Sequence, residues 1–369
     1  MLNGIRIIEV EGLGPGPFAA MLLADLGADV VTIHRKGQHA APGMPEQSVL
    51  DRGKRSIDLD LKDPADLNIA RRLIASADAL IEGFRPGVME KLGLGPEAFR
   101  DNNPRLVYGR MTGWGQDSPL SDTAGHDLNY ISLSGALWYA SAPGHPPQTP
   151  ATLVGDIGGG AMYLVAGILA GILNAQRTGQ GTVVDAAIYD GSAHMMNLLM
   201  SLRQTGNLSD TRGLSLLDGP HWSRTYVCAD QGFVSVQCLE PKFYAEFLQR
   251  LNLTDDPEFQ KQYVPALWPT LSQRLAEIFA QHPRDHWADL FKGTDACVAP
   301  VLSPQEAQAH PMNTARQTWV DRDGVFQAAA APRFANHEWQ PKPIPSRGEH
   351  RQDILEELDT NTAPASSPG

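Results

Sequence analysis

The segment Ile5-Arg6-Ile7-Ile8-Glu9-Val10 predicts a short buried strand, because Ile and Val fill most of its positions. A helix is predicted directly after it over Pro17–Leu26, and a second strand over Ala28–His34. The alternation continues with a helix over Pro64–Ser76 and with strands over Ala77–Phe84 and Arg105–Thr112. Strands that alternate with helices are typical of a parallel sheet covered by helices. The predicted fold class is therefore α/β, with a Rossmann-like parallel sheet.

Changes in composition along the chain predict two domains. The large α/β domain is expected over residues 1–203, and residues 315–350 are expected to return to it and complete it. Residues 204–214 contain several Gly, Ser and Asp and predict a linker. Apolar and polar residues alternate on both sides of Asp230-Gln231, which predicts a hairpin. A smaller α+β domain is expected over residues 215–310. Residues 351–369 are expected to form a C-terminal tail that is disordered from Thr360 onward.

The composition is that of a soluble globular protein. Of the 369 residues, 42% are hydrophobic and 20% are charged, which leaves ample material for a core. The formal net charge of −12 disfavours nucleic acid as a partner, because an acidic surface repels polyanions. Residues 1–110 nevertheless contain 14 Lys and Arg against 15 Asp and Glu, so this part is nearly neutral. A small anionic ligand is best placed there.

The cysteines and the apolar segments indicate a cytoplasmic protein. Cys228, Cys238 and Cys297 are odd in number and form no CxxC motif, which favours free thiols in a reducing compartment over disulfides or a zinc site. The first residues lack the cationic and apolar regions of a secretion signal. The longest apolar run, Gly158–Leu173, has 16 residues, fewer than the ~20 of a membrane span, so it predicts a buried helix and no membrane partner.

A glycine-rich loop, Gly12-Leu13-Gly14-Pro15-Gly16-Pro17, follows the first predicted strand. Three interpretations stay open for it: a dinucleotide site, a tight turn without a ligand, and contact with another nucleotide-like ligand. Two details oppose NAD. Pro17 replaces the third glycine of the dinucleotide pattern, and the second predicted strand ends in His34-Arg35-Lys36 without an acid to bind a ribose hydroxyl.

Eight cations lie near the ends of the predicted strands and helices, where α/β sheets bind ligands. As a set they suit phosphate recognition, although each of them alone is expected to be solvated surface. They are Arg35, Lys36, Arg52, Lys54, Arg55, Lys62, Arg85 and Lys91. No P-loop pattern occurs, and His282 and His286 lack the adjacent Glu of a zinc motif, so a P-loop hydrolase and a metal site are not expected.

Two short motifs contain the candidate catalytic groups, Gly125-His126-Asp127 and Gly155-Asp156-Ile157-Gly158-Gly159-Gly160. Asp156 precedes a glycine-rich helix start, so one interpretation is a helix N-cap. The functional interpretation is a carboxylate beside free backbone N–H groups, where a developing oxyanion could be stabilised. His126 considered alone is more often a buried histidine with satisfied hydrogen bonds.

Taken together, several segments resemble the class III CoA-transferase superfamily, and the resemblance extends from residue 1 to about residue 335. They are Ile7–Val10, Leu23–Val31, Arg52–Ser56, Asp60–Lys62, Ile81–Gly87, Gly155-Asp156 and Asp295–Val301. Within the superfamily, Arg110–Gly115 and Gly125–Tyr130 look like the α-methylacyl-CoA racemase branch. The transferase branch usually has an aromatic residue in place of His126, and it needs only the Asp156 carboxylate as a nucleophile.

The resemblance implies an isomerase of acyl-CoA metabolism that interconverts (R)- and (S)-2-methylacyl-CoA thioesters through an enolate. Two groups on opposite faces of the substrate must then exchange protons, and His126 and Asp156 supply them. The reference pKa of aspartic acid, about 3.9, is too low for an acid near neutral pH, so the pKa of Asp156 must be raised by partial burial. No metal or cofactor is implied, since CoA is part of the substrate. A CoA-transferase and a non-catalytic CoA-binding protein stay open as alternatives.

The resemblance also implies a binding site and an assembly. Glu240 is implied as a third catalytic residue that orients the histidine from a partner subunit, with a surface acid at a strand end as the other interpretation. The family forms interlocked homodimers. The CoA moiety is implied to lie against Arg35, Leu59, Asp60, Leu61, Lys62, Gly83, Phe84, Arg85, Pro86, Gly87, Gly125, Asp127, Leu128, Asn129 and Tyr130.

Overall fold

The structure, a computed structural model, describes residues 1–37, 45–336 and 338–362. By its internal contacts the chain divides into two compact units. The first contains Met1–Ala136, Pro150–Met195 and the chain from Ala315 onward, and the second contains Leu137–Thr149 and Met196–Thr314. Residues 137–149 and 196–203, which the sequence placed in the large domain, are thus grouped with the second unit.

The first unit is built on a parallel sheet of six strands in the order β3-β2-β1-β4-β5-β6. Each strand follows a helix or loop that returns the chain to the same end of the sheet, as the alternating sequence predicts. The strands are β1 (Arg6–Val10), β2 (Asp29–Arg35), β3 (Arg55–Leu59), β4 (Ala79–Glu82), β5 (Val107–Thr112) and β6 (Thr182–Ala187). The fold class predicted from the sequence, an α/β protein with a parallel sheet, is confirmed.

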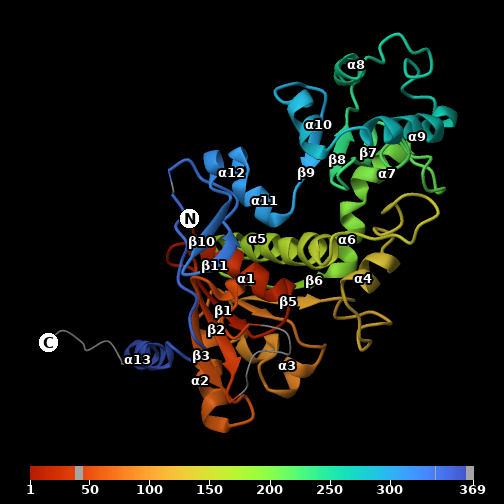
Figure 1. The fold of residues 1–369 in the computed structure, drawn as a ribbon. Helices are drawn as coiled ribbons and strands as arrows, with labels where there is room; N and C mark the ends of the chain where they lie inside the picture. The colour runs from red at the N-terminus through yellow and green to blue at the C-terminus, as the bar shows by residue number, and fades with distance from the viewer. Residues whose placement is uncertain (38–44, 337, 363–369) are drawn as a thin grey trace. The chain divides into compact units, whose positions relative to one another are not determined.

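Helices cover both faces of this sheet, because successive side chains of a strand point to opposite faces. Ile7 of β1 packs with α1 and α5 on one face, and its neighbour Ile8 packs with α2 and α13 on the other. Figure 1 shows α5 and α1 on one side of the strands and α2 and α3 on the other. The helices of the unit are α1 (Pro15–Asp25), α2 (Pro64–Ala75), α3 (Val88–Lys91), α4 (Asp127–Leu133), α5 (Met162–Thr178), α6 (Ile188–Met195) and α13 (Arg351–Thr362).

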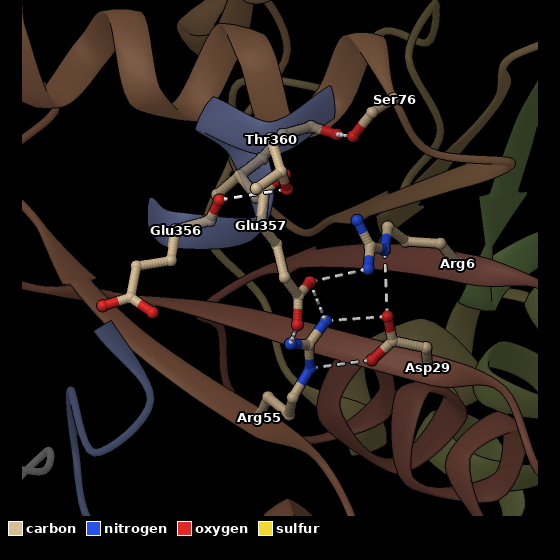
Figure 2. A network of polar contacts seen from close by, with 8 residues as sticks. Arg6, Asp29, Arg55, Ser76, Glu356, Glu357 and Thr360 are labelled. Atoms are coloured by element: carbon tan, nitrogen blue, oxygen red, sulfur yellow. Dashed lines mark hydrogen bonds and ion pairs between the residues drawn. The ribbon is translucent and has the colours of Figure 1, made fainter. Parts of the chain in front are cut away.

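The edge strand β3 is absent from the sequence prediction. Arg55 and Asp58 interrupt its apolar residues, so the segment resembles a solvated loop. In the structure the charge of Arg55 is compensated, because its guanidinium bonds Asp29 of β2 at 2.8 Å and Glu357 of α13 at 2.6 Å. Arg6 bonds the same two carboxylates, each at 2.9 Å (Figure 2). Residues 351–362, which the sequence assigned to a tail, therefore form a docked helix. The predicted disorder from Thr360 onward is wrong for residues 360–362, and residues 363–369 lie outside the described residues.

The second unit contains an antiparallel sheet of three strands, β7 (Ser223–Val227), β8 (Phe233–Gln237) and β9 (Val298–Val301). The hairpin predicted around Asp230-Gln231 is the β7–β8 connection. Trp222 and Phe247 are among the fully buried side chains of the core of this unit. Its helices include α7 (Asn197–Arg203), α8 (Pro241–Arg250), α9 (Trp268–Phe279), α10 (Arg284–Phe291) and α11 (Pro304–Ala309). Helix α12 (Pro311–Arg316) contains residues of both units. It is followed in the first unit by an antiparallel hairpin of β10 (Trp319–Arg322) and β11 (Val325–Ala328).

An apolar helix is present as predicted, but the helical segment has 26 residues, more than the 16 of the apolar run, and it is only partly buried. Within the described residues, the helical segment Leu153–Thr178 is long and apolar enough to cross a membrane by length and composition, and 44% of its most apolar window is buried in the protein. Leu164 and Ile168 of this segment lie in the core, in one cluster with residues of α1 and of the sheet. Cys228, Cys238 and Cys297 are free thiols.

Candidate active site

The carboxyl ends of all six parallel strands meet at one edge of the sheet. The chain moves outward from β1 to β2 and β3, then crosses to β4 on the other side of β1. Loops that follow β1 and β4 therefore diverge, and the crevice between such loops is where open α/β sheets bind ligands. The glycine-rich loop of residues 12–17 follows β1, and Gly83–Gly87 follow β4.

The glycine-rich loop approaches the carboxyl group of Asp156. Gly14 has a φ of 71°, a left-handed conformation that glycine adopts without strain. A Cβ atom on Gly14 would lie 3.6 Å from Oδ2 of Asp156. The backbone of this loop therefore lies beside a candidate catalytic group.

His126 stands immediately before α4. Its carbonyl oxygen accepts the N–H of Asn129 at 2.8 Å, and its own N–H donates to Oδ1 of Asn129 at 3.0 Å. These reciprocal bonds fix the start of the helix. The residue is exposed, so the alternative of a buried histidine with satisfied hydrogen bonds is wrong.

Asp127, the next residue, connects α4 to the Asp156 segment. Its Oδ1 accepts the N–H groups of Gly155 and Asp156, both at 2.9 Å. A Cβ atom on Gly155 would lie 2.4 Å from that oxygen and 2.8 Å from Ile131, so glycine is required at this position. The two catalytic motifs of the sequence, separated by about 30 residues, are therefore held together by a single carboxylate.

Asp156 lies inside a π-helical segment, η3 (Leu153–Ala161), that continues into α5. It is not the N-cap of a helix: Thr152 holds that position, so the capping interpretation is wrong. π-helical turns are rare and occur frequently at functional sites. Gly158, Gly159 and Gly160 lie in this segment, and glycine stabilises a regular α-helix poorly because its backbone is unusually free.

The pKa of Asp156 is raised to about 6. Burial is the main cause, the negative charge of Asp127 adds to it, and the nearby His126 partly opposes it. The expectation that burial raises this pKa is confirmed. A carboxyl group with a pKa near 6 is substantially present in both protonation states close to neutral pH, which a group that both takes and gives protons requires.

Tyr130 of α4 packs against Trp114, which lies in the loop after β5. Their rings meet edge to face with centroids 4.7 Å apart, and the Tyr130 hydroxyl donates to the carbonyl oxygen of Gly125. Burial and the negative charge of Asp156 raise the pKa of Tyr130. Tyr130 thus stays neutral and holds the loop that carries His126.

The predicted CoA-binding segments lie at the carboxyl edge of the sheet. Arg35 at the end of β2 is paired in register with the buried Leu59 at the end of β3. The N–H of Arg35 donates to Glu11 at 3.0 Å, and Glu11 is held by two bonds from Arg347 at 2.6 and 2.7 Å. Burial alone would raise the pKa of Glu11, but hydrogen bonds from His34, Arg347 and Arg35 lower it strongly. The backbone of Arg35 is therefore fixed while its side chain is exposed.

The loops after β3 and β4 are also fixed by carboxylates. Oδ1 of Asp60 accepts the N–H of Lys62 at 3.0 Å, and Leu61 lies between them. After β4, Oε2 of Glu82 accepts the N–H of Phe84 at 2.8 Å. The remaining loop residues are Gly83, Arg85, Pro86 and Gly87, with Arg85 exposed. In α4, Leu128 and Asn129 are exposed as well.

Half of the eight cations are occupied elsewhere. Arg52 pairs with Asp25 at 2.6 Å and Lys54 with Glu9 at 2.6 Å, and both side chains are buried. Arg55 belongs to the network of Figure 2, and Lys36 pairs with Asp66 at 3.2 Å. Among the described residues, Arg35, Lys62, Arg85 and Lys91 form no such pair and are exposed. Only these four remain suited to phosphate.

Glu240 belongs to the second unit, where it precedes α8 and is exposed. Its charge acts on Tyr263, whose pKa is raised first by burial and then by the negative charge of Glu240. Within the described ranges no cluster of three or more His, Cys, Asp or Glu is arranged to bind a metal ion.

Sequence reasoning missed Glu82 as a residue that shapes the site. Its side chain is buried and also bonds Arg110 at 2.9 Å, while Arg110 bonds Glu90 at 2.8 Å. Burial is the first cause that raises the pKa of Glu82, and the Phe84 N–H and Arg110 oppose it. The available signal was an acidic residue at the end of an otherwise apolar strand.

The model of the CoA-transferase family III matches residues 2–351. The alpha-methylacyl-CoA racemases of Mus musculus and Homo sapiens are each 40% identical over 362 residues, which cover 97% of this chain and 93% of each relative. A crystal structure of a CAIB/BAIF family protein from Brucella suis superposes with a TM-score of 0.82 at 26% identity and covers 97% of this chain and 99% of its own. The chain therefore belongs to CoA-transferase family III.

Proposed function

We propose that the protein is a racemase that interconverts (R)- and (S)-2-methylacyl-CoA thioesters by moving one proton at C2. One observation carries the proposal: Asp127 holds the Asp156 segment directly beside His126, and the pKa of Asp156 lies at about 6. A nucleophile for acyl transfer gains nothing from a second titrating neighbour, whereas proton exchange at carbon needs two. The 40% identity to mammalian alpha-methylacyl-CoA racemases supports the same activity.

The chemistry requires one deprotonated and one protonated group. The thioester carbonyl makes the C2 proton acidic, because the electron pair left by the proton is delocalised onto the thioester oxygen as an enolate. One of His126 and Asp156 takes this proton, and the other delivers its own proton to the opposite face of C2. No oxidation state changes, so the proposed reaction uses no redox cofactor.

The CoA part of the substrate is proposed to bind along the carboxyl edge of the sheet. Arg35, Lys62 and Arg85 are exposed there, at the ends of three different strands. Their charges suit the phosphates of CoA, since charge-assisted bonds to phosphate are among the stronger polar contacts. The fixed loops around them reduce the cost of ordering on binding.

Incubation of single epimers in D₂O tests the proposal. The parent should incorporate deuterium at C2 and lose optical purity. The variants His126→Ala and Asp156→Asn should each racemise several orders of magnitude more slowly, because each inversion needs both groups. Deuterium exchange without inversion should survive unequally: exchange of the S epimer in Asp156→Asn and of the R epimer in His126→Ala. Equal loss for both epimers in both variants, with unchanged melting temperatures, would reject the assignment of faces.

The same incubation separates the alternatives. Transfer of CoA to an added free acid, undiminished in His126→Ala, would identify a CoA-transferase that uses Asp156 as its nucleophile. Tight acyl-CoA binding without exchange or transfer would identify a non-catalytic binding protein. A panel of acyl chains in this assay defines the substrate range.

We also propose a cytoplasmic homodimer of the interlocked kind. Support comes from the first unit, where Leu153, Met162 and Leu173 are large apolar side chains exposed on one continuous helical segment, and Val183 is exposed on the edge strand β6. Such surface is normally covered in a partner contact. Glu240 is proposed to orient His126 across the two copies. Sedimentation of the purified protein at micromolar concentration should give a dimer.

A further inference from the structure

Asp127 has one carboxylate oxygen whose purpose the fold does not explain. The residue is 5% exposed. Oδ1 is used fully by the N–H groups of Gly155 and Asp156, whereas Oδ2 is buried and has no hydrogen-bond partner among the described residues. A buried carboxylate oxygen without a partner is costly, and an amide would make the same two bonds without the charge. The charge itself is therefore the feature to explain.

The carboxylate of Asp127 has little freedom to move away from Asp156. Oδ1 lies 2.4 Å from the place where a Cβ of Gly155 would be, which shows how closely the backbone of η3 packs on it. Both its bonds reach N–H groups of η3, one of them the N–H of Asp156 itself. The Asp127 carboxylate is thus fixed against the backbone of Asp156 by main-chain hydrogen bonds.

Among the described residues, two charged groups act on Asp156, Asp127 and His126. Asp127 is the first residue of α4 and His126 is the residue before it. The loop before α1 contributes Gly14, which carries no charge. Helix α6 also packs on η3. On this helix, burial and then the negative charge of Asp185 raise the pKa of Asp190, and the Nδ1 atom of His194 lies 2.7 Å from the Tyr163 hydroxyl. Asp127 is therefore the negative neighbour of Asp156.

We propose that Asp127 is a positioning residue that holds the Asp156 segment through two backbone bonds and, through its negative charge, keeps part of the Asp156 population protonated near neutral pH. This role rests on the proposed racemase function, because only a group that both gives and takes the C2 proton needs both states. Asp127 itself need not exchange a proton with the substrate.

The variant Asp127→Asn tests the proposal, because Asn keeps the shape and the oxygen that accepts both N–H bonds but removes the charge. In protein labelled with ¹³C at the aspartate carboxyls, the Asp156 signal, identified by its loss in Asp156→Asn, should titrate about one pH unit lower than in the parent. The acidic limb of the kcat/KM profile for racemisation should move to lower pH with it. A purely structural role would lower the activity at all pH values without moving the limb.

Asp230→Asn is the matched control. Asp230 also accepts two backbone N–H groups, from Gly232 and Arg284, each at 3.1 Å, and it lies in the second unit in the β7–β8 turn. This variant should leave both the Asp156 titration and the profile unchanged. If Asp127→Asn does not fold, Asp127→Ser provides a smaller neutral acceptor for the same measurement.

The titration and the rate separate the two proposals. An unchanged Asp156 titration in Asp127→Asn, or a parent Asp156 that titrates near the ordinary value of 3.8, would overturn the role of Asp127 whatever the activity. A parent without any exchange at C2 would overturn the racemase function, and the titration would still report whether the charge of Asp127 acts on Asp156.

Discussion

Asp156 is a candidate catalytic residue, and its ionisation near neutral pH lowers the stability of the folded protein. Its folded pKa of about 6 lies above the ordinary value of 3.8. The stability that the protonated group contributes is therefore fully present below about pH 3.8 and is lost as the pH rises through about 6. Above pH 7 the folded protein holds a carboxylate that is half-buried and repelled by Asp127.

The variant Asp156→Asn should consequently be more stable than the parent at pH 8, and the two should be nearly equal at pH 4. The expected gain at pH 8 is about 1–2 kcal/mol, discounted because the group is half-exposed and solvent screens it. Urea unfolding at pH 4, 6 and 8 measures the difference.

Asp230→Asn should show the opposite trend. Desolvation alone would raise the pKa of Asp230, but hydrogen bonds from the N–H groups of Arg284 and Gly232 together lower it. That stability is present above the ordinary pKa and is lost on acidification, so this variant should lose stability at pH 8. Equal stability of Asp156→Asn and its parent at pH 8 would mean that the raised pKa of Asp156 is absent.

Single residues differ in how far their sequence context reveals them. His126 and Asp156 could be selected because their short motifs resemble those of a known family. The connection between them could not, because the Asp127 bond to the N–H of Asp156 depends on how α4 packs on η3. Arg52 and Lys54 were misjudged as ligand-binding cations, since a list of charges does not show which of them are buried beside Asp25 and Glu9.

At the level of elements, the strand ends determine where a polyanionic ligand can lie. Arg35 ends β2 with its backbone fixed by Glu11 and its side chain exposed. Removal of one charge-assisted phosphate contact costs about 1.5–3 kcal/mol. Arg35→Ala should therefore raise the KM for acyl-CoA about tenfold or more and leave kcat nearly unchanged, as steady-state racemisation rates at several substrate concentrations would reveal.

Arg100→Ala is the appropriate comparison for Arg35→Ala. Arg100 is an exposed arginine of the same unit, but it pairs with Glu97 of the short helix η2 (Pro96–Phe99), away from the strand ends. Its replacement should not change KM. If the two variants have the same KM, Arg35 is solvated surface without a role in binding.

The elements themselves were largely predictable where apolar periodicity decides them. Strands β1, β2 and β4 are buried on both faces over most of their length, and each contains adjacent apolar residues, Ile7-Ile8, Val30-Val31 and Leu80-Ile81. Strand β3 was missed because the charge of Arg55 is neutralised by Asp29 and Glu357, which are 26 and 302 positions away in the sequence. The local sequence around Arg55 does not indicate such distant partners. The π-helical turn of η3 was likewise unforeseen, because glycines permit it and only packing against α6 requires it.

At the scale of the whole molecule, the C-terminal helix α13 completes the sheet of the first unit. Ile354 and Leu358 are buried in the core against β3 and α2, and Glu357 bonds Arg6 and Arg55 (Figure 2). Arg6, Asp29 and Arg55 all begin their strands, so this network lies at the amino edge of the sheet, opposite the candidate active site. Docking of α13 should therefore affect stability and not catalysis.

Two variants of α13 separate the apolar from the ionic part of this docking. Ile354→Ala should destabilise the protein by about 2–5 kcal/mol at any salt concentration, because it leaves a cavity in the core. Glu357→Gln should cost only about 1 kcal/mol, since the Arg55 and Glu357 side chains are 22% and 41% exposed, and the loss should shrink in 0.5 M salt. Glu356→Gln changes the exposed neighbour and should cost nothing measurable. Urea unfolding at low and high salt checks all three, and kcat should remain that of the parent in each folded variant. A large, salt-independent loss in Glu357→Gln would show that the ion network, rather than the buried Ile354, holds the helix to the sheet.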